Sequence, residues 1–575
     1  MPDGVQVRAR PIAIDLPRVK VAHIALAAIM TAAFLTRFAR LETPREFYFD
    51  EIYFVRDSAQ QIYHGDNKAW EFYGHENTHP PLSKLLIAGS LGVVGAADAI
   101  APPLVPGDGG VDNSFAWRFP GALAGVGSVL FMYLLARRLF DSEIAGLAGA
   151  FLLTCEGLAL AQSRIATPDT FVLFFVLGCV YFLVTQRFLF AGLFFGAGVA
   201  TKWIAALAGI PIVLFLLWLL ITRLREARSD GEAKWFEVAL PSGLVSSYAG
   251  IALVLVGFLS RHPDQKPGLF DGLGLLDLFG WLLLVAGVLS VVCALIAMLS
   301  QYSERRALVF SERGRVSLEV VLAFGVFFML LPGFVYFLTY VPMLLNHPST
   351  QAMGDIGWTG LGQVVRQNRL AYDFHQSLRA PHPYSSTWDT WPIMGRPVYF
   401  YAGDHNAKIY ALGNPIIFWA SLPALAFALW QGLAYVRARL QTSGALTIWG
   451  SLPQRSAALL FVVISYLGLW LPMGLTARVV FIYHYLPALS FAILALALSI
   501  DWLWKREEPW GRYAAGAYLV LVALTFAFFY PHLTAIPIAD WLEKLYYPFD
   551  RGNLLDKCLD PFGNHCPGNH LWDWE

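Results

Sequence analysis

The sequence predicts an all-α protein that crosses a membrane many times. Of its 575 residues, 57% are hydrophobic and only 14% are charged, and the mean hydropathy is +0.53. A soluble core cannot bury so much apolar surface, so the bilayer must solvate it. Apolar runs recur from one end of the chain to the other without a long soluble block between them. These features predict a single transmembrane body without a separate catalytic domain.

The apolar runs indicate how many helices cross the membrane. A helix needs about 20 apolar residues to cross roughly 30 Å of hydrocarbon. Thirteen runs meet or approach this length: 21–40, 118–139, 144–163, 168–186, 188–200, 203–222, 238–259, 276–299, 318–341, 413–436, 455–473, 478–500 and 513–531. The first run continues into Arg37 and Arg40 without a small-residue cleavage site, so we interpret it as a retained span. The sequence therefore predicts about 13 transmembrane helices.

The segment 81–97 decides the predicted orientation. It is apolar but short, starts at a pair of prolines and contains Lys84. If it does not cross, most basic residues lie in loops on the N-terminal side, and the positive-inside rule makes that side cytoplasmic. We therefore expect an amphipathic helix lying in or against the outer interface. The N-terminus is then cytoplasmic, and the C-terminal tail is extracytoplasmic.

This topology divides the chain into a transmembrane body, 1–531, and an extracytoplasmic tail, 532–575. Three polar segments of the body share the outer face: the first outer loop 41–117, the turn 163–169 and the large outer loop 342–412. We therefore expect residues that act at a polar surface outside the membrane to lie in these three segments.

The five cysteines fall into two groups. Cys155, Cys179 and Cys293 lie inside apolar runs and are expected to be buried thiols. Cys558 and Cys566 lie in the tail, where a disulfide and a metal pair are both open interpretations.

An acidic pair, Asp50 and Glu51, stands near the start of the first outer loop. Apolar residues at 52, 55, 59 and 62 follow a helical period, so the pair should begin a short amphipathic helix. The simplest interpretation is that Asp50 caps this helix and Glu51 interacts with its dipole.

Several basic residues should face the same compartment as the acidic pair. They are Lys84, after the sequence His79-Pro80-Pro81, Arg164 in the turn before Asp169, Lys202 at the end of a span, and Arg478. One such cation usually snorkels to the interface or anchors a helix end. Several together beside carboxylates favour an anion site.

The large outer loop is rich in aromatic residues around Tyr384 and Arg396, and a further aromatic motif surrounds His484. Such residues are common in interfacial belts. They would equally suit stacking against a sugar ring or an acceptor chain, and composition does not choose between these roles.

Five motifs in this order resemble the protein O-mannosyltransferase family, enzymes of the GT-C fold that use dolichyl- or polyprenyl-phosphate mannose. The motifs are Phe49-Asp50-Glu51, His79-Pro80-Pro81-Leu82-Ser83-Lys84, Ser163-Arg164-Ile165 through Asp169, His382-Pro383-Tyr384 through Arg396-Pro397-Val398, and Tyr483-His484-Tyr485-Leu486-Pro487. Loop 342–412 has only about 70 residues, too few for the β-trefoil module of the eukaryotic members. The chain therefore looks more like the bacterial branch.

The resemblance implies an inverting transfer of mannose from a lipid phosphate to Ser or Thr hydroxyls of exported proteins. It also suggests the secretion machinery as a partner. Asp50 would be the catalytic base and Glu51 would orient the acceptor or the helix. Lys84, Arg164 and Arg478 would hold the phosphate. The residues expected to contact the sugar or the acceptor are His79, Asp169, Tyr384, Arg396 and His484, with Lys202 as a lower-ranked basic contact.

The lipid-phosphate-linked sugar is the donor substrate, and we expect neither a cofactor nor a metal, because no His, Cys and carboxylate cluster has firm metal spacing. The zero net charge does not favour nucleic acid as a partner. Three alternatives stay open: a same-fold transferase with a lipid or glycan acceptor, as in the aminoarabinose transferases; a transporter; and a catalytically silent member that binds lipid-linked sugar.

Overall fold

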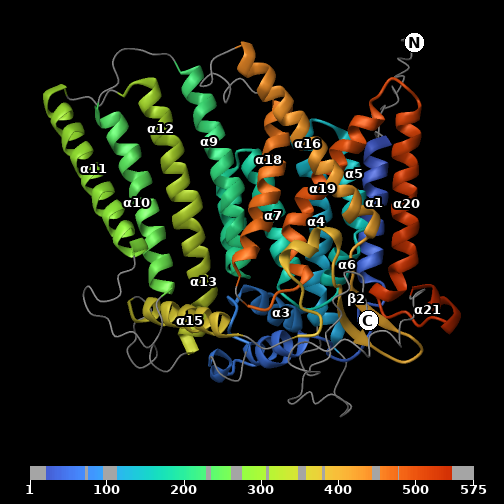
Figure 1. The fold of residues 1–575 in the computed structure, drawn as a ribbon. Coiled ribbons are helices and arrows are strands. Elements are labelled where there is room, and N and C mark those ends of the chain that lie inside the picture. Colours follow the sequence, from blue (N-terminus) through green and yellow to red (C-terminus); the bar gives the residue numbers. More distant parts are fainter. Residues whose placement is uncertain are drawn as a thin grey trace, which may run out of the picture.

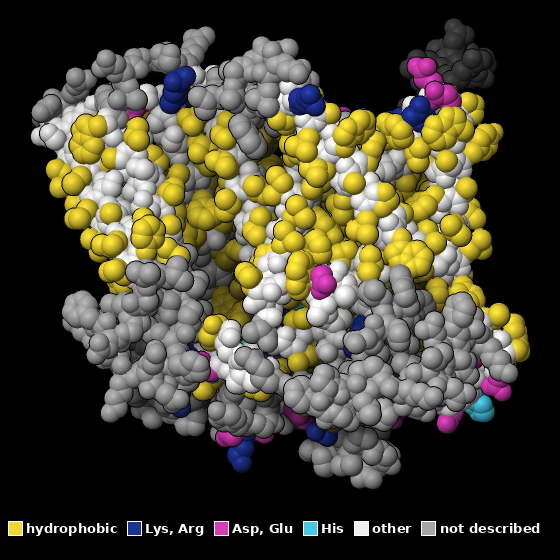
Figure 2. All heavy atoms as spheres, in the orientation of Figure 1, with side chains coloured by type: hydrophobic (Ala, Val, Ile, Leu, Met, Phe, Trp, Pro, Cys, Tyr) yellow, Lys and Arg dark blue, Asp and Glu magenta, His cyan; other side chains and the backbone are white. Residues whose placement is uncertain are grey.

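The computed structural model describes residues 21–71, 76–94, 113–227, 235–260, 275–305, 310–346, 358–378, 382–442, 454–476 and 478–546. Long helices lie side by side and form a bundle (Figure 1). Cys558, Cys566 and most of the predicted tail 532–575 lie outside the described residues. Figure 2 shows a broad band of apolar side chains across one face of the bundle, with most of the visible charged side chains above or below it. This surface is the one expected of an integral, multi-pass membrane protein.

The predicted apolar runs all coincide with helices. The helices of the bundle are α1 (Val21–Phe38), α4 (Ser114–Phe140), α5 (Glu143–Thr154), α6 (Gly157–Ser163), α7 (Asp169–Val184), α8 (Phe188–Val199), η4 (Trp203–Ala208), α9 (Gly209–Glu226), α10 (Trp235–Ser260), α11 (Leu275–Arg305), α12 (Glu312–Ala323), η5 (Phe324–Leu330), α13 (Leu331–Asn346), α16 (Pro415–Thr442), α18 (Gln454–Trp470), η7 (Leu471–Leu475), η8 (Ile482–Tyr485), α19 (Leu486–Trp504) and α20 (Trp510–Leu533).

The predicted count of 13 spans is not confirmed. Within the described ranges, nine helices are long and apolar enough to cross, or ten if the bent pair α5 and α6 is one span. That pair bends by 62° at the break between Thr154 and Gly157. Helices α7 and α8 are apolar but shorter than a full span.

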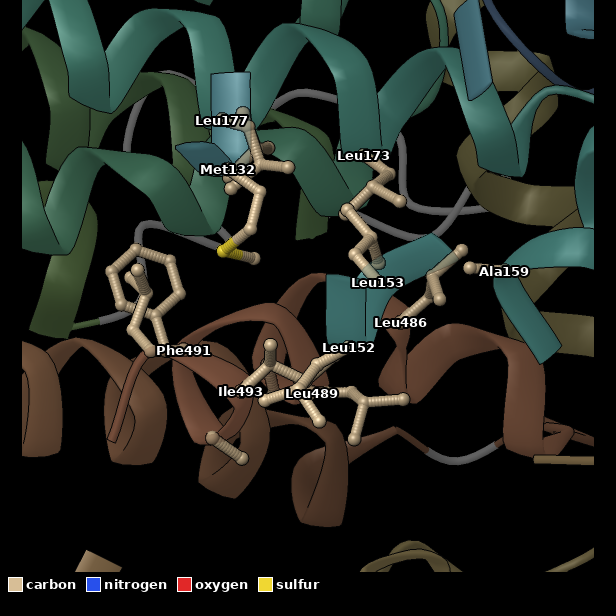
Figure 3. Close-up of a cluster of buried hydrophobic side chains, with 14 of the residues drawn as sticks. Met132, Leu152, Leu153, Ala159, Leu173, Leu177, Leu486, Leu489, Phe491 and Ile493 are labelled. Carbon is tan, nitrogen blue, oxygen red and sulfur yellow. The ribbon is translucent and has the colours of Figure 1, made fainter. Parts of the chain in front are cut away.

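Helix α19 lies at the centre of the bundle. Its most apolar window is 83% buried, against 11% for α1. Figure 3 shows Leu489, Phe491 and Ile493 of α19 facing side chains of other helices. These partners include Met132 of α4 and Leu152 of α5. The core of the protein therefore forms where α5, α16 and α18 pack closely around α19, with α4 and α7 beside them.

Shorter elements gather at one end of the bundle, the lower end in Figure 1. They are η1 (Ile52–Gln60), α2 (Gln61–Tyr63), η2 (Asn67–Trp70), α3 (Leu82–Val93), α15 (Trp358–Ser377), η6 (Trp388–Ile393), β1 (Val398–Ala402), β2 (Lys408–Ala411) and α21 (Asp540–Tyr546). The predicted amphipathic helix after Asp50 is present as η1, a helix with π-type hydrogen bonds. Its Val55 and Ala59 are buried, as the apolar spacing indicated.

Helix α3 confirms that the segment starting at residue 81 is helical, although residues 95–97 lie outside the described ranges. Its 12 residues are about 18 Å long, too short to cross. Ile87 and Leu91 pack in the same cluster as Val55 and Trp117. The helix thus rests on the protein at the end of the bundle.

The all-α prediction missed one small sheet in the large outer loop. Strands β1 and β2 pair antiparallel, with Val398 opposite Ala411. The connecting turn has positive φ at His405 (54°) and Asn406 (59°), which the tight turn of a hairpin favours. The β-branched and aromatic sequence of β1 carried this signal, but the surrounding aromatic belt obscured it.

The prediction that three cysteines are buried thiols is right for two of them. Cys155 and Cys179 are buried, but Cys293 of α11 is exposed on the surface of the bundle. Only 11% of the apolar window of α11 is buried, because this helix packs mainly on α10 at the edge of the bundle.

We predict that Gly287→Ala loosens the contact between α10 and α11. A Cβ at Gly287 would lie 2.5 Å from the Ser247 backbone nitrogen, so the helices must separate, at a cost of about 1–3 kcal/mol. The measurement is thermal unfolding in detergent, with Gly516→Ala as the matched control because a Cβ there meets nothing within 4 Å. Equal melting temperatures for the two variants would contradict the close packing.

Candidate active site at the loop end of the bundle

The acidic pair occupies the turn between α1 and η1. Phe49 has φ of 50°, a left-handed conformation that is uncommon for a bulky residue. The two carboxylates that follow have opposite surroundings: the Glu51 side chain is fully buried, whereas Asp50 is partly exposed. The turn therefore places two adjacent carboxylates in different environments.

Glu51 forms a buried ion pair with Arg118 of α4. Both carboxylate oxygens accept from the guanidinium at 2.8 Å, and both side chains are 0% exposed. The backbone N–H of Ala166 donates to the same carboxylate at 3.0 Å. Arg118 also donates to the carbonyls of Leu41, Pro44 and Glu46. Glu51 thus joins three chain segments, and its assignment as a catalytic residue stays a prediction.

Asp50 has no such commitment. Within the described residues, no hydrogen bond or ion pair engages its carboxylate. Burial raises the pKa of Asp50 to about 6, partly opposed by the positive charges of Lys202 and Arg478 and reinforced by Asp169 and Glu76. A carboxylate with a pKa near neutrality and free oxygens is suited to accept a proton.

Asp169 and Lys202 form a second buried pair beside Asp50. Lys202 Nζ lies 2.9 Å and 3.1 Å from the two Asp169 oxygens. The same ammonium lies 5.4 Å from the ring centre of Tyr483, within range of a cation–π interaction. The turn 163–169 and the end of α8 are therefore locked together next to the acidic pair.

Lys84 is engaged by its own loop, which does not support its predicted role as a phosphate ligand. The side chain is 0% exposed. Its ammonium donates to the Glu76 carbonyl, to Glu76 Oε2 at 3.2 Å, to Asn77 Oδ1 at 3.2 Å and to the His79 carbonyl at 3.1 Å. These four acceptors exhaust its three N–H donors.

Arg164 is likewise committed. Its guanidinium donates to the carbonyls at the end of α1: Thr36 at 3.3 Å, Arg37 at 2.8 Å, Ala39 at 2.8 Å and Arg40 at 3.0 Å. The end of a helix leaves such carbonyls without intrahelical partners, so a buried arginine there stabilises the helix. These contacts support the alternative in which Arg164 anchors a span, in place of the phosphate role.

Arg478 differs from both. Its Nε donates to the Val479 carbonyl at 3.2 Å and its Nη1 is hydrogen-bonded to His375 Nδ1. Three of its five N–H donors have no hydrogen-bond partner among the described residues. Of the three predicted phosphate ligands, Arg478 therefore has the most donors without a partner in the described part of the chain, and it is partly exposed, whereas Arg164 is buried.

Two histidines line the same region. His79 stacks on His375, with ring centres 5.1 Å apart, and on Phe54, with ring centres 5.9 Å apart. Burial and the nearby cations lower the pKa of His79 well below its usual value, so the ring is neutral. His79 thus lies in the region of the site, as an uncharged polar side chain.

The other predicted sugar or acceptor residues form hydrogen bonds within their own segments. Tyr384 donates its N–H to His382 Nδ1, and Arg396 donates to the Ser385 carbonyl. His382 in turn lies against Phe49, with ring centres 6.3 Å apart. His484 is buried, with its Nδ1 on the backbone of Phe481, which indicates a structural role.

Sequence reasoning missed Glu76, Arg118 and His375. Glu76 and His375 belong to outer loops and carried no periodic or motif signal. Arg118 stands in the first turns of a predicted span, where a charged residue inside an apolar run was itself a signal of a buried partner. No group of three His, Cys, Asp or Glu side chains that could hold a metal is present in the ranges that the structure describes. The expectation of no metal and no cofactor stays a prediction.

Two family models match this chain. Residues 27–248 match dolichyl-phosphate-mannose-protein mannosyltransferase, and residues 361–545 match the C-terminal four-transmembrane region of protein O-mannosyltransferase. Together these ranges hold the acidic pair, Arg118, the Asp169–Lys202 pair, His375 and Arg478.

The chain belongs to the protein O-mannosyltransferase family. The polyprenol-phosphate-mannose–protein mannosyltransferase of Mycobacterium tuberculosis is 25% identical over 546 residues, 87% of this chain and 86% of that protein. The enzyme of the same name from Mycolicibacterium smegmatis is 25% identical over 568 residues, 91% of this chain and 92% of that protein.

A solved structure confirms the fold that the resemblance implied. The S. cerevisiae protein O-mannosyltransferase Pmt1–Pmt2 complex bound to the sugar donor gives a TM-score of 0.63 at 13% identity. The match covers 92% of this chain and 92% of that chain. This O-mannosyltransferase therefore has the GT-C architecture.

We predict that Arg118→Met prevents stable folding of this transferase, because it leaves Glu51 buried without its partner, at a cost of about 3–5 kcal/mol. The measurement is the yield and melting temperature of detergent-solubilised protein. Arg315→Met is the control: its ion pair with Glu319 is exposed and 3.7 Å long, so its loss should change stability by less than about 1 kcal/mol. A normal melting temperature for Arg118→Met would contradict the anchoring role.

Proposed function

We propose that this chain transfers mannose, with inversion, from polyprenyl-phosphate mannose to Ser or Thr hydroxyls of exported proteins. One observation carries the proposal: the carboxylate of Asp50, unpaired within the described ranges, lies close enough to the guanidinium of Arg478 for their charges to interact. A glycosyl transfer from a phosphate needs both a proton acceptor and a stabiliser of the departing anion. The names of the mycobacterial relatives support the choice of donor and acceptor.

In the proposed step, the acceptor oxygen attacks C1 of the mannose while Asp50 accepts the hydroxyl proton. The bond between C1 and the phosphate oxygen breaks, and both bonding electrons leave with the polyprenyl phosphate. Arg478 holds the resulting anion, and Asp50 later releases its proton to water. A positioned base contributes about 10²- to 10⁴-fold to such a rate.

The other residues shape this centre. The Asp169–Lys202 pair supplies a fixed dipole beside Asp50, and His79 gives a neutral polar surface for the sugar or acceptor. The partly exposed ring of Phe49 packs on the buried Phe400 of the large loop, with ring centres 4.4 Å apart, and gives the site an apolar side. Sugar rings stack on such surfaces through their C–H faces.

The charge distribution supports an extracytoplasmic active site. Arg137 and Arg138 end α4, and Lys505 and Arg506 follow α19, at the end of the bundle opposite α3 and α15 (Figure 1). The positive-inside rule makes that end cytoplasmic. Asp50 would then meet proteins that have already crossed the membrane.

We predict that Asp50→Asn lowers mannosyl transfer by at least about 10²-fold, because the amide cannot accept the proton. Purified protein in liposomes is assayed with polyprenyl-phosphate mannose and a Ser/Thr-rich peptide. Asp57→Asn, in the same loop but paired with Arg56, is the matched control and should keep its activity. Transfer unchanged in Asp50→Asn would remove the base assignment. Absence of peptide transfer by folded wild type that still binds the donor would instead favour a lipid or glycan acceptor.

We also predict a fall in the single-turnover rate below about pH 6. Because burial raises the pKa of Asp50 to about 6, the ionised base is abundant above that pH and becomes scarce below it. At pH 5 about one tenth of the enzyme would carry the active base. The measurement is the transfer rate between pH 5 and 8 with saturating donor. A rate that stays constant down to pH 5 would show that Asp50 is not the titrating base.

A further inference from the structure

The guanidinium of Arg478 is oriented by a residue from a distant part of the chain. His375 lies in the last turn of α15, in the large outer loop, and its Nδ1 is hydrogen-bonded to Arg478 Nη1. Its other ring nitrogen, Nε2, lies 3.0 Å from the Thr78 carbonyl. One imidazole therefore connects α15, the loop before α3 and the segment before α19.

The two contacts define the tautomer of His375. A backbone carbonyl only accepts, so Nε2 must carry the hydrogen. An arginine only donates, so Nδ1 must be the unprotonated acceptor. Burial and the charge of Arg478 lower the pKa of His375 to about 4, which keeps the ring in this neutral form near pH 7. The ring is thus a fixed acceptor for one arginine N–H.

Other contacts hold α15 in place, so the position of the imidazole does not depend on Arg478 alone. Asn368 accepts from the Tyr336 hydroxyl of α13, which itself accepts from Trp203 Nε1 at 3.1 Å. Trp203 also packs edge-on against His375, with ring centres 6.0 Å apart. The imidazole also stacks on His79. These two ring contacts restrict the orientation of His375 independently of the guanidinium.

We infer that His375 is a positioning residue for the lipid-phosphate donor: its neutral Nδ1 orients Arg478 so that the remaining guanidinium donors face the phosphate. The inference rests on the proposed function of this site. It makes α15 part of the donor site, a role that no motif in the sequence indicated for that helix. The hydrogen bond to Thr78 fixes the orientation of the ring, and the hydrogen bond to Arg478 fixes the orientation of the guanidinium.

Two substitutions separate these contacts. In His375→Asn the amide oxygen takes the place of Nδ1 and can still accept from Arg478, but the contact with Thr78 is lost. In His375→Gln the amide nitrogen takes the place of Nε2 and can still donate to Thr78, but the contact with Arg478 is lost. Both variants are compared with wild type for polyprenyl-phosphate binding in detergent and for the KM of the donor against kcat.

We expect His375→Gln to weaken polyprenyl-phosphate binding and raise the donor KM by about tenfold or more, because a hydrogen bond to a charged group is lost. His375→Asn should stay within about threefold of wild type. In an Arg478→Ala background His375→Gln should have no further effect, since the residue it acts through is gone. Melting temperatures establish that each variant is folded.

Three outcomes would overturn the inference: equal losses in the two variants, the reverse order, or additive effects in the Arg478→Ala background. Each would mean that His375 acts only by docking α15. Failure of the proposed function gives a different result. Wild type would then bind polyprenyl phosphate, with the same order of the variants, but would transfer no mannose to the peptide.

Discussion

The buried ion pair between Glu51 and Arg118 is the interaction on which the rest of the site depends. Removing two charges from water is costly, and the pair is stable because each partner makes further hydrogen bonds. The guanidinium gathers the carbonyls of 41–46, and the carboxylate holds the turn at Ala166. The ion pair therefore fixes the loop after α1, helix α4 and the turn before α7 relative to one another. The position of Asp50 follows from this arrangement.

The neighbouring acids show how one backbone turn creates two chemical roles. With Phe49 in the left-handed region, Glu51 enters the protein and Asp50 remains at the polar surface. A carboxylate that accepts four hydrogen bonds has no lone pair to offer a substrate. A carboxylate without partners keeps its basicity, and partial burial increases it.

The basic residues also differ in whether the protein uses up their hydrogen-bonding groups, which here are donors. Lys84 and Arg164 are surrounded by carbonyls that the ends of helices and the proline-rich loop leave unpaired. These contacts make the framework rigid; they exhaust the donors of Lys84 and bury Arg164 against the end of α1. Arg478 stands where fewer carbonyls are in reach, and a neutral imidazole occupies one of its donors without cancelling its charge. Arg478 can then hold an anion, because no carboxylate in the part of the chain that the structure describes forms an ion pair with it.

The sequence by itself determined the membrane class, the helical body, the short helix after the acidic pair and the segments that meet at the site. These properties follow from local hydropathy, from helical period and from motifs a few residues long. The same local information placed Asp50, His79, Asp169, Lys202 and Arg478 on one face. Only the tertiary structure decided which acid is free, that Arg164 caps α1 and that His375 reaches Arg478, which lies 103 residues further along the chain. Burial and hydrogen-bond partners are set by segments distant in sequence, and the reactivity of an ionisable group depends on those two quantities.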